Sequence, residues 1–197
     1  MTKVLDKAQG IIVAGVGGQG AITLAQLILG AAWKSNYHCL QSEVHGMSQR
    51  GGAVNAHIVF DSGPVTSPTI MEGSADVLIG MEPLETLRYI HMVKKDGHII
   101  SSTSPLVNMS TYPDESKVQA AIEEIEGIHL VDTDETSKQL KNRHAGNVIL
   151  LGMASTFLPM EHDLWNSIFE ERFQTKGEKV VQKNIEAFAF GRNLINT

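Results

Sequence analysis

Four glycines within six residues, placed between a short apolar run and a longer one, constrain this chain more than any other feature. The loop reads Gly15-Val-Gly-Gly-Gln-Gly20 and follows the apolar, β-branched residues 10–14. Such a run predicts a buried strand, and residues 19–35, apolar on nearly all sides, predict a buried helix. Because glycine permits a sharp turn, the helix is expected to pack directly on the strand.

The same loop is suited to bind an anion. Glycine lets the backbone approach a phosphate closely, and a helix N-terminus offers unpaired N–H groups and the positive end of the helix dipole. The candidate ligand-binding residues of this loop are Gly15, Gly17, Gly18, Gln19 and Gly20. The alternative is a tight strand-to-helix turn without a ligand, because the pattern alone has low specificity.

The rest of the chain alternates strand and helix patterns, as in a layered α/β domain. We expect a single domain over residues 1–197, a three-layer α/β/α Rossmann-like fold with a largely parallel sheet and a helical C-terminal part over about 135–197. Lys95-Asp-Gly97 predicts a turn. Strands are predicted over residues 10–14, 37–44, 53–60, 76–81, 98–102 and 128–131. Helices are predicted over 19–35, 82–93, 114–125, 162–173 and 179–195, and one more helix is expected to end near residue 157.

Charge and cysteine content exclude several classes of function. The formal net charge is -6 with no basic run, which disfavours sequence-independent nucleic-acid binding. Apolar runs are shorter than the roughly 20 residues that span a bilayer, and the N-terminal residues do not resemble a signal peptide. Cys39 is the only cysteine, so an iron–sulfur cluster, which needs about four thiolates, cannot be built from this chain. The histidines form no metal-binding pair, no catalytic set is recognisable, and we expect a cytoplasmic protein without a metal site.

Charged residues are unevenly distributed. Residues 8–60 contain only Lys34, Glu43 and Arg50, although the whole chain has 16 basic and 22 acidic residues. Depletion of charge is typical of the core of an interface, and a surface of Gly, Ser, Gln, Asn and Met is consistent with one. The alternative is that these residues simply form the apolar core of the domain.

Residues 43–52, Glu-Val-His-Gly-Met-Ser-Gln-Arg-Gly-Gly, predict a second functional loop. Arg50 is the only permanent cation between Lys34 and Arg88, and its guanidinium suits a phosphate, a carboxylate or an acid of a partner protein. The alternative is a surface loop with one solvated arginine. The candidate binding residues of this second loop are Ser48, Gln49, Arg50, Gly51 and Gly52.

A stand-alone NAD- or FAD-binding protein is the main alternative for the glycine loop. That function expects an acidic residue on the ribose about 20 residues after the glycines. Glu43 is the only nearby acid, and it lies 28 residues after Gly15 and leads into the polar loop. The spacing therefore disfavours a dinucleotide.

Taken together, the loop at residues 15–20 and the sequence Ser-Glu-Val-His-Gly-Met-Ser-Gln-Arg-Gly-Gly at 42–52 resemble the gamma-type domain of pyruvate and other 2-oxoacid:ferredoxin oxidoreductases. The second motif is most similar to that of the beta subunit of the indolepyruvate enzymes. Related gamma subunits usually have a Tyr-Gly-Pro-Glu-type sequence before the shared Arg-Gly-Gly, which this chain lacks. Asn-Val-Ile-Leu-Leu-Gly at 147–152 and Asn-Ile-Glu-Ala-Phe-Ala-Phe-Gly at 184–191 also resemble the family.

The resemblance implies oxidative decarboxylation of a 2-oxoacid, with coenzyme A accepting the acyl group and ferredoxin the electrons. It places thiamine diphosphate and iron–sulfur clusters on larger partner subunits, and the chain has no Gly-Asp-Gly motif of a thiamine diphosphate site. The chain itself would be a non-redox subunit, inactive alone. It would scaffold its partners and contribute to a coenzyme A site through the two loops.

Overall fold

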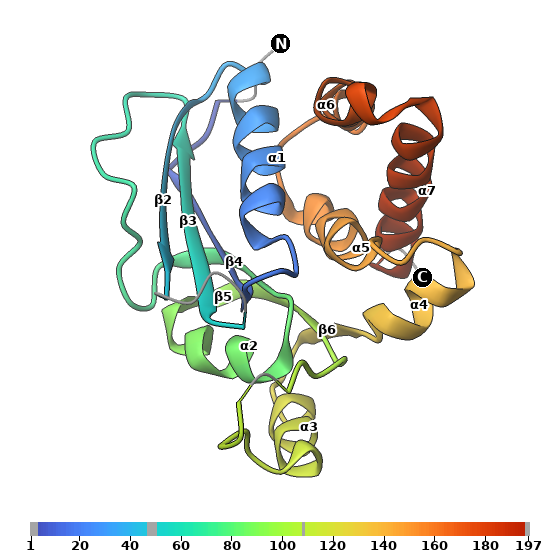
Figure 1. The fold of residues 1–197 in the computed structure, drawn as a ribbon. Helices are drawn as coiled ribbons and strands as arrows, with labels where there is room; N and C mark the ends of the chain where they lie inside the picture. Colours follow the sequence, from blue (N-terminus) through green and yellow to red (C-terminus); the bar gives the residue numbers. More distant parts are fainter. Residues whose placement is uncertain (1–3, 47–50, 108, 196–197) are drawn as a thin grey trace.

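The computed structural model describes residues 4–46, 51–107 and 109–195. A twisted sheet lies between layers of helices (Figure 1), which confirms the expected α/β/α class. The strands are β1 (Gln9–Val16), β2 (His38–His45), β3 (Ala53–Asp61), β4 (Ala75–Gly80), β5 (Val93–Ser102) and β6 (Ile128–Val131). The helices are α1 (Ala21–Lys34), α2 (Pro83–Tyr89), α3 (Glu115–Glu123), α4 (Thr133–Gln139), α5 (Gly146–Ala154), α6 (Leu164–Phe173) and α7 (Glu178–Ile195), with 3-10 turns η1 (Ile90–Met92), η2 (Ser155–Phe157) and η3 (Gln174–Lys176).

The sheet is largely parallel, as predicted, with one exception. Its strand order is β2-β3-β1-β4-β5-β6, and β1, β4, β5 and β6 pair in parallel. β3 pairs antiparallel with both β1 and β2. Residues 46–52 are too few for the crossover that a parallel pair needs, so β2 and β3 form a hairpin instead.

The two faces of the sheet are covered unequally. Alternate residues of β1 point to opposite faces, with Ile11 and Val13 in the larger core and Ile12 and Ala14 in a smaller one. Helices α1 and α5 cover the larger core, with α6 and α7 packed outside them (Figure 1). On the other face, α2 and the segment 62–74 cover the smaller core, to which Ile70 contributes.

Some predicted boundaries were wrong. Lys95-Asp-Gly97 is not a turn but part of β5, where the pairing with β4 shifts register between Ala75 and Val77. A Cβ on Gly97 would lie 2.5 Å from Val93 Cγ1 and 3.0 Å from the carbonyl oxygen of Ala75, so glycine is needed for this close approach. The helix predicted over 82–93 ends as η1 before β5, and α4 was not predicted.

Helices α5 and α7 cross at two glycines. A Cβ on Gly152 would overlap the carbonyl oxygen of Phe188 and lie 3.1 Å from the Cα of Gly191. A Cβ on Gly191 would in turn overlap the carbonyl oxygen of Ile149. The backbones of the two helices are therefore in direct contact, which explains the glycine in each C-terminal motif.

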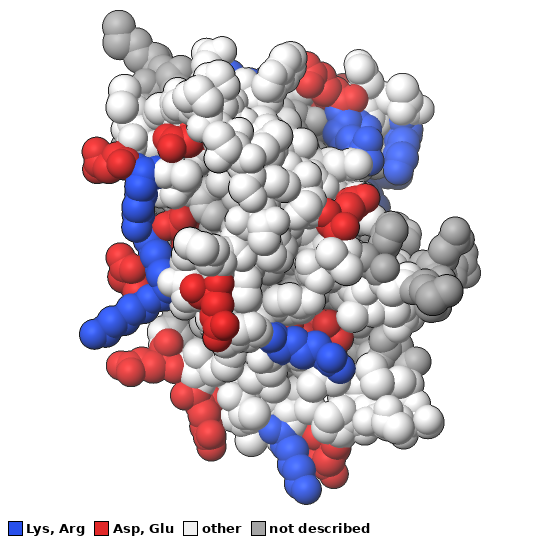
Figure 2. All heavy atoms as spheres, turned by 90° about the vertical axis from the view of Figure 1, so that its left-hand side faces the viewer, with Lys and Arg blue, Asp and Glu red and all other residues white. Residues whose placement is uncertain are grey.

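The segment 62–71 carries no Asp, Glu, Lys or Arg. Figure 2 looks from the side on which this segment lies and shows a continuous uncharged area, with charged side chains mostly around it. Met71, at the end of this segment, is 75% exposed. The low charge density of residues 8–60 thus continues, after Asp61, into a segment that reaches the surface. In the described ranges, no helix combines the length and apolar character needed to cross a bilayer.

Candidate functional site

The glycine loop joins the carboxyl end of β1 to α1, next to the chain leaving β4. Gly18 and Gly20 have φ angles of 107° and 92°, in the left-handed region that favours glycine. A Cβ on Gly15 would lie 3.0 Å from the Cβ of Met81, the residue after β4. These glycines shape a turn that a side chain would disturb.

Gln19 closes this loop. Its Oε1 accepts a hydrogen bond from the backbone N–H of Val16 at 2.8 Å, and its Nε2 donates to the carbonyl oxygen of Met81 at 3.0 Å. Both ends of the amide are therefore bonded within the protein. Gln19 holds the loop against the end of β4, and its predicted role in binding a ligand stays a prediction.

The two sequence motifs meet in space. The backbone N–H of Gly17 donates to the carbonyl oxygen of Gly52 at 2.8 Å, and the N–H of Gly51 donates to the carbonyl oxygen of Gly17 at 3.3 Å. Gly51 and Gly52, which directly precede β3, and the glycine loop are therefore one hydrogen-bonded unit. The other predicted residues of the second motif, Ser48, Gln49 and Arg50, lie outside the described residues.

Next to the glycine loop lies a hollow of about 470 Å³, here called the loop hollow. One wall is the loop, the start of α1 and Met81, and the other comes from residues 133–176. The two walls touch, because a Cβ on Gly20 would lie 2.7 Å from Nδ2 of Asn147. The lining residues are Gly18, Gln19, Gly20, Thr23, Met81, Thr133, Asp134, Ser137, Arg143, His144, Gly146, Asn147, Leu150 and Lys176.

The electrostatics of the loop hollow favour an anion. Helices α1 and α5 both begin at it, with no side-chain cap hydrogen bond and no acid in the first turn. Their N–H groups and dipoles thus remain available to a ligand. Arg143 and Lys176 add two permanent positive charges, and Asp134 is the one acid among the described lining residues.

Helix α4 differs from α1 and α5 at this site. Its N-terminus is capped by Asp132, whose Oδ1 accepts hydrogen bonds from the backbone N–H groups of Asp134 at 3.1 Å and Glu135 at 2.9 Å. The bond from Glu135, with others, holds the pKa of Asp132 below its usual range. The N-terminus of α4 is thereby satisfied internally, and α4 supplies side chains to the loop hollow.

The structure brings together only part of the predicted site. Gly18, Gln19 and Gly20 line the loop hollow, whereas Gly15 packs under Met81. Gly51 and Gly52 support the loop from behind. The sequence analysis did not predict Arg143, His144 and Lys176. Arg143 and His144 could have been noticed, because they lie just before the start of α5, whose first turn contains no acidic residue. Whether any of these residues binds a ligand stays a prediction.

A buried carboxylate, that of Glu82, holds Tyr112 near the carboxyl end of β4. Glu82 is buried, and it accepts hydrogen bonds from the backbone N–H of Glu85 at 2.8 Å and from the hydroxyl of Tyr112. Burial raises the pKa of both Tyr112 and Glu85. Because these groups are engaged with one another, we assign them a structural role.

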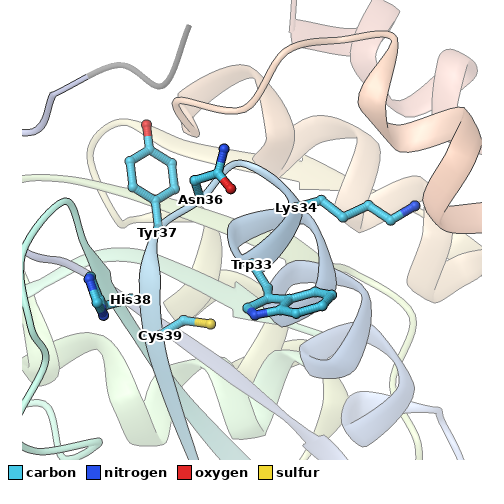
Figure 3. Close-up of a pocket in the computed structure, with 6 residues that line it drawn as sticks. All are labelled: Trp33, Lys34, Asn36, Tyr37, His38 and Cys39. Carbon is cyan, nitrogen blue, oxygen red and sulfur yellow. The ribbon is translucent and has the colours of Figure 1, made fainter.

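A second hollow, of about 560 Å³, lies at the other end of α1 and includes Trp33, Lys34 and Cys39. Figure 3 shows the Sγ of Cys39 pointing toward the indole ring of Trp33, while Lys34 points away toward α6. Lys34 forms an ion pair with Glu171 at 2.6 Å. This hollow has no helix N-terminus or converging cations, so we do not regard it as the ligand site. No group of three His, Cys, Asp or Glu able to hold a metal occurs in the described part of the chain.

Comparison with known proteins gives a consistent result. The family model described as pyruvate ferredoxin/flavodoxin oxidoreductase matches residues 10–194. The chain is 32% identical over 190 residues to indolepyruvate oxidoreductase subunit IorB of Archaeoglobus fulgidus, covering 93% of each chain. It is 37% identical over 154 residues to the Pyrococcus horikoshii subunit of the same name, covering 74% of this chain and 76% of that one.

Solved structures share the fold. A keto/oxoacid ferredoxin oxidoreductase gamma subunit from Geobacter sulfurreducens superposes with a TM-score of 0.71 at 18% identity, covering 95% of this chain and 98% of that one. A 2-oxoglutarate:ferredoxin oxidoreductase from Magnetococcus marinus, solved with 2-oxoglutarate, coenzyme A and succinyl-CoA bound, superposes with a TM-score of 0.76 at 20% identity over 98% of this chain. The chain spans 32% of that longer polypeptide.

No comparison supports a stand-alone dinucleotide-binding protein. In the Rossmann strand order, the ribose-binding acid follows a parallel strand next to the first one. Here the strand between β1 and β2 is the antiparallel β3, and Glu43 lies on β2, not among the residues that line the loop hollow.

Proposed function

The chain belongs to the pyruvate ferredoxin/flavodoxin oxidoreductase family, and on that premise we propose that it is the small, non-redox subunit of a 2-oxoacid:ferredoxin oxidoreductase complex. Such a complex oxidatively decarboxylates a 2-oxoacid, transfers the acyl group to coenzyme A and passes the electrons to ferredoxin. The family match over nearly the whole chain, with relatives of similar length that are named as subunits, carries this proposal. The names of those relatives favour indolepyruvate or another aryl pyruvate as the substrate.

The residues of this chain do not fit the redox cofactors of such a complex. A single cysteine cannot supply the ligands of an iron–sulfur cluster. The clusters are therefore assigned to the larger partner subunits. Thiamine diphosphate is assigned to them as well, because this chain has no Gly-Asp-Gly motif. No chemical step is assigned to this chain, whose own residues are left to bind, orient and assemble.

Coenzyme A is the ligand that best suits the loop hollow. It carries a diphosphate and a ribose phosphate, and the hollow offers two uncapped helix starts with Arg143 and Lys176 beside them. Each helix dipole contributes about 0.3–1 kcal/mol near a surface, which is too little for tight binding without the cations and the partner subunit. We therefore expect weak binding to the isolated chain and stronger binding in the complex.

We further propose that the larger subunits contact the uncharged area around the segment 62–71 and the end of the β2–β3 hairpin. Depletion of charge in this area is what the core of an interface requires. The hairpin end is hydrogen-bonded to the glycine loop, so the same contact would bring the partner close to the loop hollow.

Kinetics of the complete complex test the coenzyme A site. Arg143→Ala and Lys176→Ala should each raise the KM for coenzyme A about tenfold, which is the effect of losing about 1.4 kcal/mol, while the KM for the 2-oxoacid stays unchanged. Lys179→Ala is the matched control, because Lys179 is exposed, lies three residues from Lys176 and does not line the hollow. If both variants match this control in an intact complex, coenzyme A does not bind here.

A further inference from the structure

Strand β2 forms an unpaired edge of the sheet. It is hydrogen-bonded to β3 on one side, and no other strand in the described part of the chain lies on its second side. Natural proteins usually protect such an edge with lysine, proline, a bulge or a short strand. β2 has eight residues, and among them Glu43 is the only charged one and none is proline. This edge is therefore open to pairing with a further strand.

Apolar side chains flank the edge on both faces of the sheet. On the α1 side, Trp33 is 71% exposed and lines a hollow together with Cys39 of β2 (Figure 3). On the opposite face, Leu40 and Val44 are 37% and 63% exposed. A strand added to β2 would bury apolar surface on both sides in addition to forming backbone hydrogen bonds.

We propose that this strand is β2 of a second copy of the chain, paired antiparallel about a two-fold axis at Ser42. In such a pair, residues opposite each other lie on the same face, so their residue numbers sum to a constant even value. An axis at Ser42 places Leu40 opposite Val44 of the second copy, and Val44 opposite its Leu40. Both exposed apolar side chains of this face thereby gain an apolar partner.

The charged residue fits the same register. Glu43 lies opposite Gln41 of the second copy, so that each carboxylate faces an amide donor and not another carboxylate. Within one chain, Gln41 Nε2 already lies 3.4 Å from Glu43 Oε2, which shows that the two side chains lie on the same face of β2. An axis shifted to Gln41 would instead place Leu40 opposite Ser42 and Glu43 opposite Cys39. The register at Ser42 is the better matched of the two.

The pairing leaves the proposed ligand site free. β2 runs parallel to β1, and the two-fold axis reverses its direction in the second copy. The loop hollow lies at the carboxyl ends of the strands, and these ends point in opposite directions in the two copies of the continuous sheet.

Site-specific disulfide formation tests the register in the full-length chain. In a Cys39→Ala background, Ser42→Cys places two thiols directly opposite each other, with Cα atoms about 4.5–5.5 Å apart. Mild oxidation should give a disulfide-linked species of twice the 21.4 kDa mass. Val44→Cys is the matched control, because its two thiols would be about 13 Å apart and should not react. No product from Ser42→Cys, equal products from both variants, or a product only with a larger subunit of the complex would overturn the proposal.

A charge exchange tests the same pairing without a covalent bond. Leu40→Lys and Val44→Glu should each raise the dissociation constant of the dimer at least tenfold in sedimentation equilibrium. The double variant places each introduced lysine opposite an introduced glutamate of the second copy, and should recover most of the affinity in a salt-sensitive manner. The two positions are about 13 Å apart within one strand and do not compensate each other there. Single variants that associate like the wild type, or a double variant weaker than both, would contradict the register.

Discussion

The contact between α5 and α7 predicts that Gly152→Ala destabilises the protein, although alanine is the better helix former. The new Cβ would overlap the carbonyl oxygen of Phe188 and lie 3.0 Å from the backbone nitrogen of Arg192. These are backbone atoms, so no side-chain rotation relieves the overlap, and the helices must separate by about 1 Å to restore normal contact distances. Overpacking of this kind costs about 1–3 kcal/mol, and separating two buried helices loses further contacts.

Replacing glycine by alanine in a helix contributes about 1 kcal/mol in the opposite direction. We therefore expect a net loss of about 2–3 kcal/mol in the free energy of unfolding, from an overpacking cost at or above the upper end of its range. With a urea m-value of roughly 2 kcal/mol per molar, the unfolding midpoint should fall by about 1–1.5 M. Fluorescence of the buried Trp165, whose ring centroid is 5.3 Å from that of Phe188, reports the transition beside α7.

Gly30→Ala is the control for this prediction. Gly30 is also within a helix, but a Cβ there would lie 3.7 Å from Cδ1 of Ile168, an ordinary van der Waals distance. This variant should be as stable as the wild type, or more stable by up to about 1 kcal/mol. If Gly152→Ala behaved like Gly30→Ala, the backbones of α5 and α7 would not be in direct contact.

Two further predictions concern charged and titratable groups. Asp76 is buried and its Oδ1 lies 2.7 Å from Lys94 Nζ, so Asp76→Ala should lower the free energy of unfolding by about 3 kcal/mol in urea titrations. Asp96 is 81% exposed and lies 3.7 Å from the same Nζ, so Asp96→Ala should change the free energy of unfolding by less than about 0.5 kcal/mol. Equal effects of the two variants would show that Asp76 is not the main partner of Lys94. Burial lowers the pKa of His98 and His129 in the folded protein, so below about pH 6.5 the unfolded chain binds more protons than the folded one. The urea midpoint of unfolding should therefore fall as the pH falls from about 7.5 to 5.5, and it should fall less in a variant with both histidines replaced by Gln. A wild-type midpoint that does not change over this pH range, as in the variant, would refute this prediction.

Local patterns predicted most elements of the fold. Residues 10–14 lie within β1, and residues 128–131 coincide with β6, because short apolar runs bounded by glycine or polar residues have few alternatives. The direction of β3 was not predicted, since it depends on how a seven-residue connection closes. Lys95-Asp-Gly97 was misassigned because an Asp-Gly pair is typical of a turn, whereas here glycine serves a tight approach between two strands.

The candidate site was predictable only in its N-terminal half. The glycine loop is recognisable from its own sequence, since the φ angles of Gly18 and Gly20 are a local requirement. Arg143 and Lys176 line the same hollow although they lie more than 100 positions after the glycine loop in the sequence. Such proximity arises from tertiary packing between distant segments, which periodicity along the chain does not encode.

The hydrogen bonds between Gly17 and the pair Gly51 and Gly52 have a thermodynamic consequence. If a partner subunit binds the hairpin and coenzyme A binds the loop, the two ligands act on a single structural unit and their binding free energies are linked. Linkage is reciprocal, so the factor by which the subunit raises the affinity for coenzyme A is the factor by which coenzyme A raises the affinity for the subunit. Subunit exchange in the complex would therefore slow or quicken with the cellular supply of the acyl acceptor, without any separate regulatory site.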